Sequence, residues 1–207
     1  MVQPDPRDEE NALHSPARVS DTGSVPVWDP VVRIFHWVIV AGVVLNYALL
    51  DAGKAPHRFV GYVVAAALAV RVAWGFVGSA HARFSSFVVG PRLALSHLAS
   101  IWSGRDRRHV GHNPAGGLMI VMLMTLLMGI CATGWMQGLD AFWGVQWVEM
   151  THAFLVDMII VMAALHVTAG VVESVRHREN LVLSMITGRK RPASGSDIDH
   201  AASSRRR

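Results

Sequence analysis

Residues 147–174 read WVEMTHAFLVDMIIVMAALHVTAGVVES, a stretch long and apolar enough to cross a lipid bilayer as one helix. The stretch carries His152 and His166, which are 166 − 152 = 14 residues apart. At about 100° per residue, this spacing brings both imidazoles within about 40° of each other on one helix face. At a rise of about 1.5 Å per residue they lie about 21 Å apart, so one is near each membrane surface. Because ionisable side chains inside a span are costly, the two histidines predict partners on other spans.

The composition indicates a membrane protein. Of the 207 residues, 52% are hydrophobic and only 16% are charged, whereas soluble domains usually carry about 25% charged residues. In a membrane protein, a net charge of +4 mostly reflects which loops lie on the cytosolic side, and we therefore expect no nucleic-acid partner. With one cysteine, Cys131, the chain cannot form an internal disulfide, a cysteine-ligated iron–sulfur cluster or a covalent CxxCH haem attachment.

The apolar blocks predict an all-α fold, an integral membrane four-helix bundle with short amphipathic cytosolic helices. We expect spans at about 30–50, 57–77, 114–135 and 147–174. Residues 91–104, flanked by arginine, predict a helix lying on the membrane surface. These elements form one domain over residues 27–190, and residues 1–26 and 191–207 are expected to be disordered cytosolic tails.

The loops differ sharply in charge. The connection between the second and third blocks contains Arg83, Arg92, Arg105, Arg107 and Arg108. The segment after the fourth block is also rich in basic residues, whereas the other two loops contain only Lys54, with Arg58 at the start of a helix. By the positive-inside rule, the basic loops and both termini are cytosolic.

This topology pairs four histidines by depth. His36 on the first span and His166 on the fourth lie near the cytosolic face, and His57 on the second span and His152 on the fourth lie near the outer face. Each pair joins two different helices. A b-type haem with two imidazole ligands needs nitrogens from opposite sides of its ring, and a four-helix bundle builds such sites from facing helices. The pattern therefore predicts two metal centres stacked across the membrane, each a non-covalent haem b.

Two glycines support this interpretation. Gly61 follows His57 by four residues, and Gly170 follows His166 by four, so each lies on the same helix face as its histidine. Small side chains there leave room for a macrocycle. The alternative is that they only let helices approach closely.

Two arginines, Arg33 and Arg71, fall at the level of the inner pair. Because guanidinium binds carboxylates in a bidentate manner, both are candidates for holding the propionates of the inner haem. The alternative is that they extend to the cytosolic interface, and for Arg33 this alternative is nearly as strong.

Three further polar residues near the spans remain open. His112, in the GHNP turn before the third span, is a candidate for a substitute ligand, a donor to quinone or a residue of the helix start. Glu149 precedes His152 by three residues and is a candidate for carrying protons or orienting a ligand. Asp157 lies deeper in the fourth span, where a carboxylate calls for an explanation.

Several blocks of the chain resemble the bacterial cytochrome b-561 family. They are VWDPVVRIFHW, HRFVGY, RVAWGFVGSAHARFSSFV, GHNPAGGLMIVMLM, TGW and HRENLVLSMITGRK, and together they cover about Val27 to Lys190. This family shares a superfamily with the membrane b-type subunit of nickel–iron hydrogenases. The blocks are specific in combination, although each alone is weak.

The resemblance implies a multi-pass protein of the bacterial inner membrane that holds two b-type haems. It implies electron transfer in a respiratory chain between the quinone pool and a soluble or membrane redox partner, such as a c-type cytochrome. By position, the family's axial ligands fall on His36, His57, His152 and His166, in agreement with the depth argument. The chain would act as an electron carrier or as the cytochrome subunit of an oxidoreductase, with no catalytic side chain of its own, and a homodimer remains open.

Two other functions compete with this one. A small transporter with two histidine metal sites would use the same pairs, but few carboxylates line a path and paired broken helices are lacking. A structural anchor that docks a soluble redox enzyme through its basic cytosolic loops is the other alternative. A bound chromophore would separate the cytochrome from both.

Overall fold

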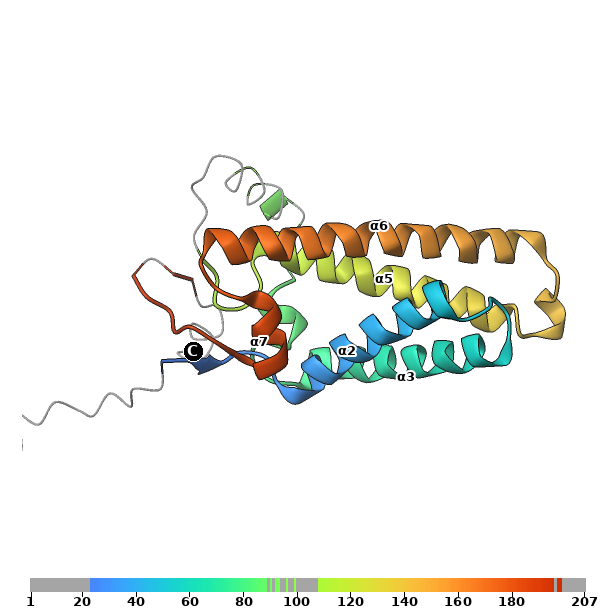
Figure 1. Cartoon of the computed structure of the whole chain (residues 1–207), viewed down its shortest axis with the longest axis horizontal. Coiled ribbons are helices and arrows are strands. Elements are labelled where there is room, and N and C mark those ends of the chain that lie inside the picture. The colour runs from blue at the N-terminus through green and yellow to red at the C-terminus, as the bar shows by residue number, and fades with distance from the viewer. Residues whose placement is uncertain are drawn as a thin grey trace, which may run out of the picture.

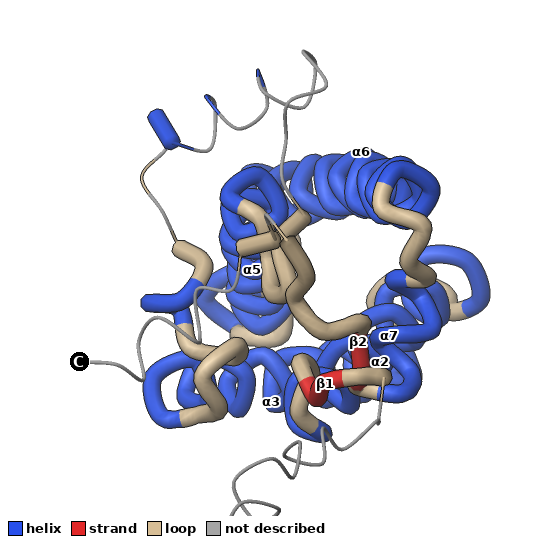
Figure 2. Tube along the Cα trace, turned by 90° about the vertical axis from the view of Figure 1, so that its left-hand side faces the viewer, coloured by secondary structure: helices blue, strands red, loops and turns tan. Residues whose placement is uncertain are grey.

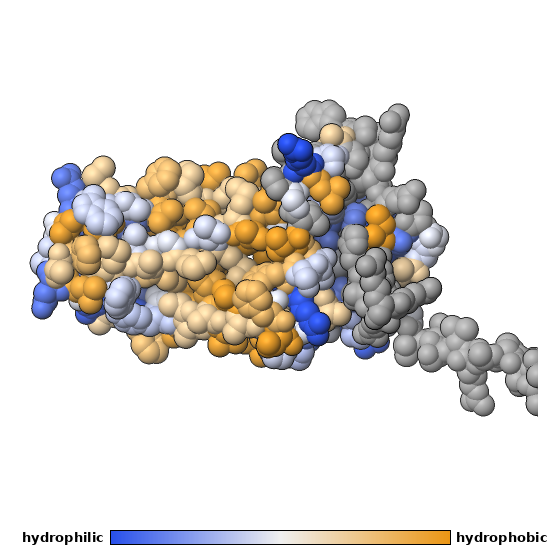
Figure 3. All heavy atoms as spheres, turned by 180° about the vertical axis from the view of Figure 1, so that it is seen from behind, coloured by the Kyte–Doolittle hydropathy of each residue, from blue (hydrophilic) through white to orange (hydrophobic). Residues whose placement is uncertain are grey.

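The computed structural model describes residues 23–88, 90, 92, 93, 96, 99, 108–195, 197 and 198. Within them, four long helices run along the longest axis of the molecule (Figure 1). They are α2 (Pro30–Val44, continued by a π-helical segment over Leu45–Leu49), α3 (Ala55–Val77), α5 (Pro114–Met136) and α6 (Gln146–Arg176). All four are long and apolar enough to cross a membrane. The surface of this part is mostly hydrophobic, with hydrophilic residues towards its two ends (Figure 3). The predicted all-α fold with four spans is confirmed.

Helices α2 and α5 begin at the same end of the bundle, which is called the inner end below, and they begin in the same way (Figure 1). Asp29 accepts a hydrogen bond from the Val32 backbone N–H at 2.9 Å, and Asn113 accepts one from Gly116 at 2.6 Å. A proline follows each cap at the first helical position, where its missing N–H costs nothing. These caps fix where the helices start and therefore the depth of every side chain along them.

The core lies where α3, α5 and α6 meet. It contains Val64, Leu68, Met124, Leu127 and Ile159. Helix α2 packs on α3 through Gly42, where an added Cβ would clash with Val64 Cγ2. The most extensively packed helix pairs are α2 with α3, α3 with α5, and α5 with α6. Helix α6 is therefore held mainly by α5, and only 6% of its most apolar window is buried, against 22% for α3.

Short elements close the inner end of the bundle. Helix α7 (Leu181–Thr187) follows α6, and strand β2 (Arg189–Lys190) then pairs antiparallel with β1 (Val25–Pro26). Figure 2 looks along the bundle from this end and shows α7 beside the start of α2, where Trp37 Nε1 donates to the Met185 carbonyl at 3.4 Å. Gly188 connects α7 to β2 with a positive φ of 78°, a conformation that suits glycine.

Short pieces of the two segments predicted to be tails make backbone pairs with the rest of the chain. Val25 and Pro26, assigned to the N-terminal tail, form β1, and Ile198, assigned to the C-terminal tail, forms a bridge with His109. The backbone pairing and the buried ion pairs of the inner end hold these segments in place. The rest of both tails, and most of the helix expected at 91–104, lie outside the described residues.

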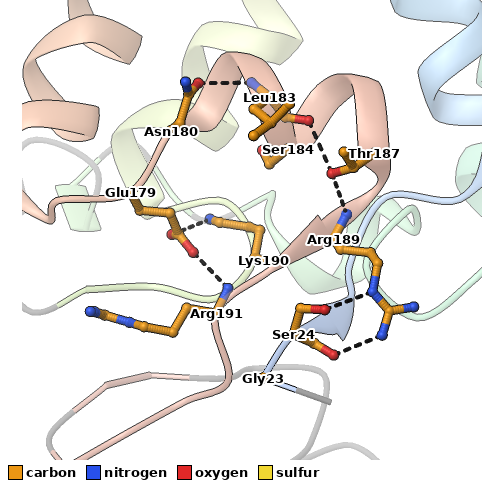
Figure 4. Close-up of a pocket in the computed structure, with 10 residues that line it drawn as sticks. All are labelled: Gly23, Ser24, Glu179, Asn180, Leu183, Ser184, Thr187, Arg189, Lys190 and Arg191. Atoms are coloured by element: carbon orange, nitrogen blue, oxygen red, sulfur yellow. Dashed lines mark hydrogen bonds and ion pairs between the residues drawn. The ribbon is translucent and has the colours of Figure 1, made fainter.

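An ion network ties the last segment to the loop before α5. Arg108 binds Glu179 and Asp197, each at 2.8 Å, and Lys190 Nζ lies 3.6 Å from Glu179. Figure 4 shows the shallow pocket between α7 and β2, where Glu179 also accepts a hydrogen bond from the Arg191 backbone N–H at 2.8 Å. The polar groups that line the pocket bind one another, so this pocket is not the candidate site.

Candidate functional site

The inner histidine pair joins α2 to α6. His36 and His166 lie close enough for a positive charge on one imidazole to act on the other. Both side chains are half-buried, and His36 Nδ1 is buried without a hydrogen-bond partner. The His36 ring contacts Trp37 edge-on, with ring centroids 5.1 Å apart.

The outer pair joins α3 to α6. His57 and His152 interact electrostatically and are half-buried. Neither α2 with α6 nor α3 with α6 is among the most extensively packed helix pairs. Each histidine pair therefore joins two helices whose backbones pack less extensively than those of their neighbours.

Thr133 on α5 contacts the ring of His152. The Thr133 hydroxyl lies 3.0 Å from His152 Nδ1 and donates its one hydrogen to the Gly129 carbonyl at 2.8 Å. The hydroxyl is thus left to accept a hydrogen bond from His152 Nδ1–H. With the proton on Nδ1, His152 Nε2 carries a free lone pair, as an axial ligand needs.

Three glycines surround the pairs. An added Cβ at Gly61 or Gly170 would meet nothing within 4 Å, so the space beside these two helix faces is open. At Gly134, an added Cβ would lie 3.2 Å from His152 Cε1, closer than most side chains tolerate. Gly134 therefore makes room for the imidazole ring itself.

Arg71 and Arg33, at the inner level, each have one buried guanidinium nitrogen without a hydrogen-bond partner. Arg71 is only 3% exposed, donates from Nη2 to the Ala82 carbonyl at 3.1 Å and lies over the Phe84 ring, while its Nη1 is buried without a partner. Arg33 Nε is also buried without a partner. Buried cations are costly unless paired, so these groups fit an anionic ligand such as a haem propionate.

His112 lies apart from both pairs. Its ring packs against Trp28 and Phe87, with centroids 4.5 and 5.0 Å away, and its Nδ1 is buried without a partner. Burial, with the nearby positive charges of Lys190 and Arg71, lowers the pKa of His112 to about 3. The side chain is therefore neutral at pH 7, and it is near enough to His166 to interact electrostatically.

Sequence reasoning missed Thr133, Gly134 and Asn46. Asn46 lies in the π-helical segment at the outer end of α2, and its Oδ1 is buried without a partner. The TGW block of the family resemblance contains Thr133 and Gly134, but it gives neither residue a role, because each acts through contacts between helices. The signal available in the sequence was a polar or small residue inside an apolar span.

The acidic candidates are not gathered into the site. Glu149 and Asp157 are both exposed. Among the residues that the structure describes, no group of three or more histidine, cysteine, aspartate or glutamate side chains could hold a bare metal ion. The donor set consists of paired imidazoles, which suits a metal that already has four ligands from a macrocycle.

Curated relatives of the chain have closely similar names. A protein from Rhodobacter capsulatus, named probable Ni/Fe-hydrogenase B-type cytochrome subunit, is 26% identical over 81% of this chain and 81% of its own length. Relatives with the same name from Bradyrhizobium diazoefficiens and Azotobacter vinelandii are 26% and 23% identical, over 81% and 83% of this chain and 86% and 90% of their own lengths. No solved structure matches the chain significantly.

The sequence pattern of one family covers most of the bundle. It is described as prokaryotic cytochrome b561 and matches residues 27–188, from just before α2 to the turn after α7. The match agrees with the four membrane spans and with the paired imidazoles. This chain belongs to the prokaryotic cytochrome b561 family and is a multi-pass membrane protein.

Proposed function

We propose that this membrane b-type cytochrome holds two haem b groups and carries electrons between the quinone pool and a redox partner in a respiratory chain. The observation that carries the proposal is the pair of depths on α6: His166 lies near enough to His36, and His152 near enough to His57, for their charges to act on each other. The two α6 positions are about 21 Å apart along the axis, most of the way across an apolar core of about 30 Å. Two redox groups at these depths divide one long transfer into shorter ones.

The haem would supply a reversible one-electron couple, and the chain's residues set its surroundings. His36 and His166 would be the axial ligands of the inner haem, and His57 and His152 those of the outer haem. The hydrogen bond from His152 to the Thr133 hydroxyl holds the outer ligand in the required tautomer. Gly61 and Gly170 would leave the macrocycles their space.

Arg33 and Arg71 would bind the carboxylates of the inner haem. Their buried N–H groups without acceptors support this role. A guanidinium near a haem also favours the reduced state, because ferric haem carries one more positive charge than ferrous haem. Burial and nearby charge would thus help to set the potential of the inner haem.

The partner we propose is a Ni/Fe-hydrogenase. The support is the names of the relatives, which are cytochrome subunits of such enzymes. A c-type cytochrome is the competing partner. Membranes containing this chain should reduce their b haem under hydrogen when the hydrogenase is present, and reduction by a c-type cytochrome alone would overturn this choice.

The orientation we propose places α7, β1 and β2 on the cytosolic side of a bacterial inner membrane. Arg108, Lys190 and the arginines around α7 gather at this end, in agreement with the positive-inside rule. Protease added to right-side-out vesicles should then leave the segment after α7 intact.

The deciding experiment is a haem count by pyridine haemochrome, with a reduced-minus-oxidised spectrum. We expect two haems b per chain in the natural protein and one in His166→Ala or His57→Ala. His177→Ala, at the C-terminal end of α6 and outside both pairs, is the matched control and should keep two. Loss of both haems or of neither in the single variants would contradict the pairing.

A chain without any haem, made with ample haem supply, would favour a metal transporter or a structural anchor. The absence of a three-ligand metal cluster among the described residues makes the transporter the weaker alternative.

A further inference from the structure

One face of α6 points away from the bundle. The side that faces inwards carries the buried Val148 and Ile159, and Leu155 contacts Gly129 of α5. Asp157 precedes His166 by nine residues, or about 900°, so it lies on the opposite side of the helix. The residues around Asp157 on this side of α6, which points away from the bundle and is called its outer face here, are all exposed. They include Met150, Val161, Ala164, Thr168 and Val171.

Asp157 lies near the middle of the membrane. Trp143 and Trp147 are 76% and 56% exposed at the outer end, where they suit the aromatic belt at the membrane surface. Asp157 is 157 − 147 = 10 residues further along α6, or about 15 Å, which is half the thickness of the apolar core. It has no hydrogen-bond or ion-pair partner among the described residues.

A carboxylate at this depth is costly against lipid, and such residues usually pair with another polar group. We propose that the outer face of α6 around Asp157 binds a transmembrane helix of another protein, one that carries a lysine or arginine at the same depth. Ala153, Ala164 and Thr168 lie on this face, and small residues let two helices approach closely. The Thr168 hydroxyl already donates to the Ala164 carbonyl at 2.8 Å, so Asp157 is the side chain that needs a donor.

Charge argues against a second copy of this chain as the occupant. Two copies inserted with the same topology would be related by an axis along the membrane normal. That symmetry would set Asp157 of one copy against Asp157 of the other at the same depth, and like charges repel strongly at low dielectric. A basic side chain from a different protein neutralises the carboxylate.

The test uses synthetic transmembrane helices as probes. One is a leucine–alanine peptide with a single central lysine, and the other has leucine at the same place. Both carry a donor fluorophore and are added to the full-length protein in phosphatidylcholine vesicles. The protein carries the acceptor on Trp143→Cys in a Cys131→Ala background, and energy transfer measures binding.

We expect the lysine peptide to bind the protein about threefold to tenfold more tightly than the leucine peptide. Asp157→Leu should remove this preference, and Asp157→Asn should reduce it. The control Asp140→Asn, an exposed carboxylate in the outer loop, should keep it. Folding of each variant is checked by circular dichroism and by its haem spectrum.

Equal binding of the two peptides to the unmodified protein would overturn the proposal. So would energy transfer between differently labelled copies of the protein that Asp157→Leu weakens, because this result would assign the face to a second copy. The proposal does not depend on the haem assignment, since a chain with fewer haems still presents the same face of α6.

Discussion

Thr133 is the residue on which the outer histidine pair depends most directly. Its hydroxyl accepts from His152 Nδ1–H because its own hydrogen is used on the Gly129 carbonyl. Thr133→Val keeps the shape of the side chain but removes this acceptor. We expect binding of the outer haem to weaken about 10–100-fold, as for other groups that orient a metal ligand. Titration of haem into the apoprotein measures this affinity.

The same helix provides a matched control for this change. Thr125 also lies on α5 and also donates to a carbonyl four residues earlier, that of Val121 at 2.9 Å, but its side chain is exposed. Thr125→Val should leave both haems bound normally. Equal weakening in the two variants would mean that loss of the threonine hydroxyl perturbs α5 itself, and the role assigned to Thr133 would be wrong.

His112 tests whether the ligand set contains a fifth histidine. Its ring is packed between Trp28 and Phe87, and an aromatic replacement should fit the same space. We therefore expect His112→Phe to keep two haems per chain, measured by pyridine haemochrome. A variant with one haem would show that His112 is a ligand, and the inner pair would need to be reassigned.

At the scale of the helices, the open space beside Gly61 and Gly170 allows a test between two roles of these glycines. They either leave room for haem or let neighbouring helices pack closely. Gly170→Leu should remove the inner haem and Gly61→Leu the outer one, because nothing else of the chain lies within 4 Å of the added Cβ. Leucine favours a helix over glycine by up to about 1 kcal/mol, so a lost haem would not reflect a weakened helix. Haem per chain and circular dichroism measure both effects.

Exposed alanines on the same helices as these glycines are the controls. Ala169→Leu and Ala66→Leu place the same bulk one residue away on α6 and five residues away on α3. Both variants should keep two haems. Variants at Gly61 and Gly170 that also keep two would show that these glycines serve only helix packing.

The four helices could be read from the sequence because a span must satisfy its own backbone and stay apolar over about 20 residues. The pairs His36 with His166 and His57 with His152 were predicted from helical spacing together with the topology of the spans, and they stay a prediction. Thr133 and Gly134 were not predicted, since their importance comes from a neighbouring helix. The β1–β2 pairing was also missed, because four residues in two strands leave no periodic pattern.

At the scale of the whole molecule, the inner end is closed by buried ion pairs as well as by the apolar cluster of Val27, Trp28 and Val110. Arg108 and Glu179 have side chains only 4% and 10% exposed, and they join the loop before α5 to the segment after α6. Burial raises the pKa of Glu179, but the hydrogen bonds from Arg108 and the Arg191 backbone N–H and the positive charges of Lys190 and Arg108 together outweigh it. The pKa therefore lies below its ordinary value of 4.5. The ionised carboxylate therefore stabilises the fold above about pH 4.5, and this contribution is lost as the pH falls through the lowered pKa.

Comparison with Glu179→Gln should show how the stability of the inner end depends on pH in the natural protein. The variant keeps the size of the side chain but not its charge, and we expect it to lower the free energy of unfolding by about 1–2 kcal/mol at pH 7. The difference in thermal stability between the two proteins should shrink as the pH falls below 4.5, because the natural protein then loses the same charge. A gap that stays constant from pH 7 to pH 3.5 would mean that Glu179 acts through its shape, and that the inner end does not depend on its ionised form.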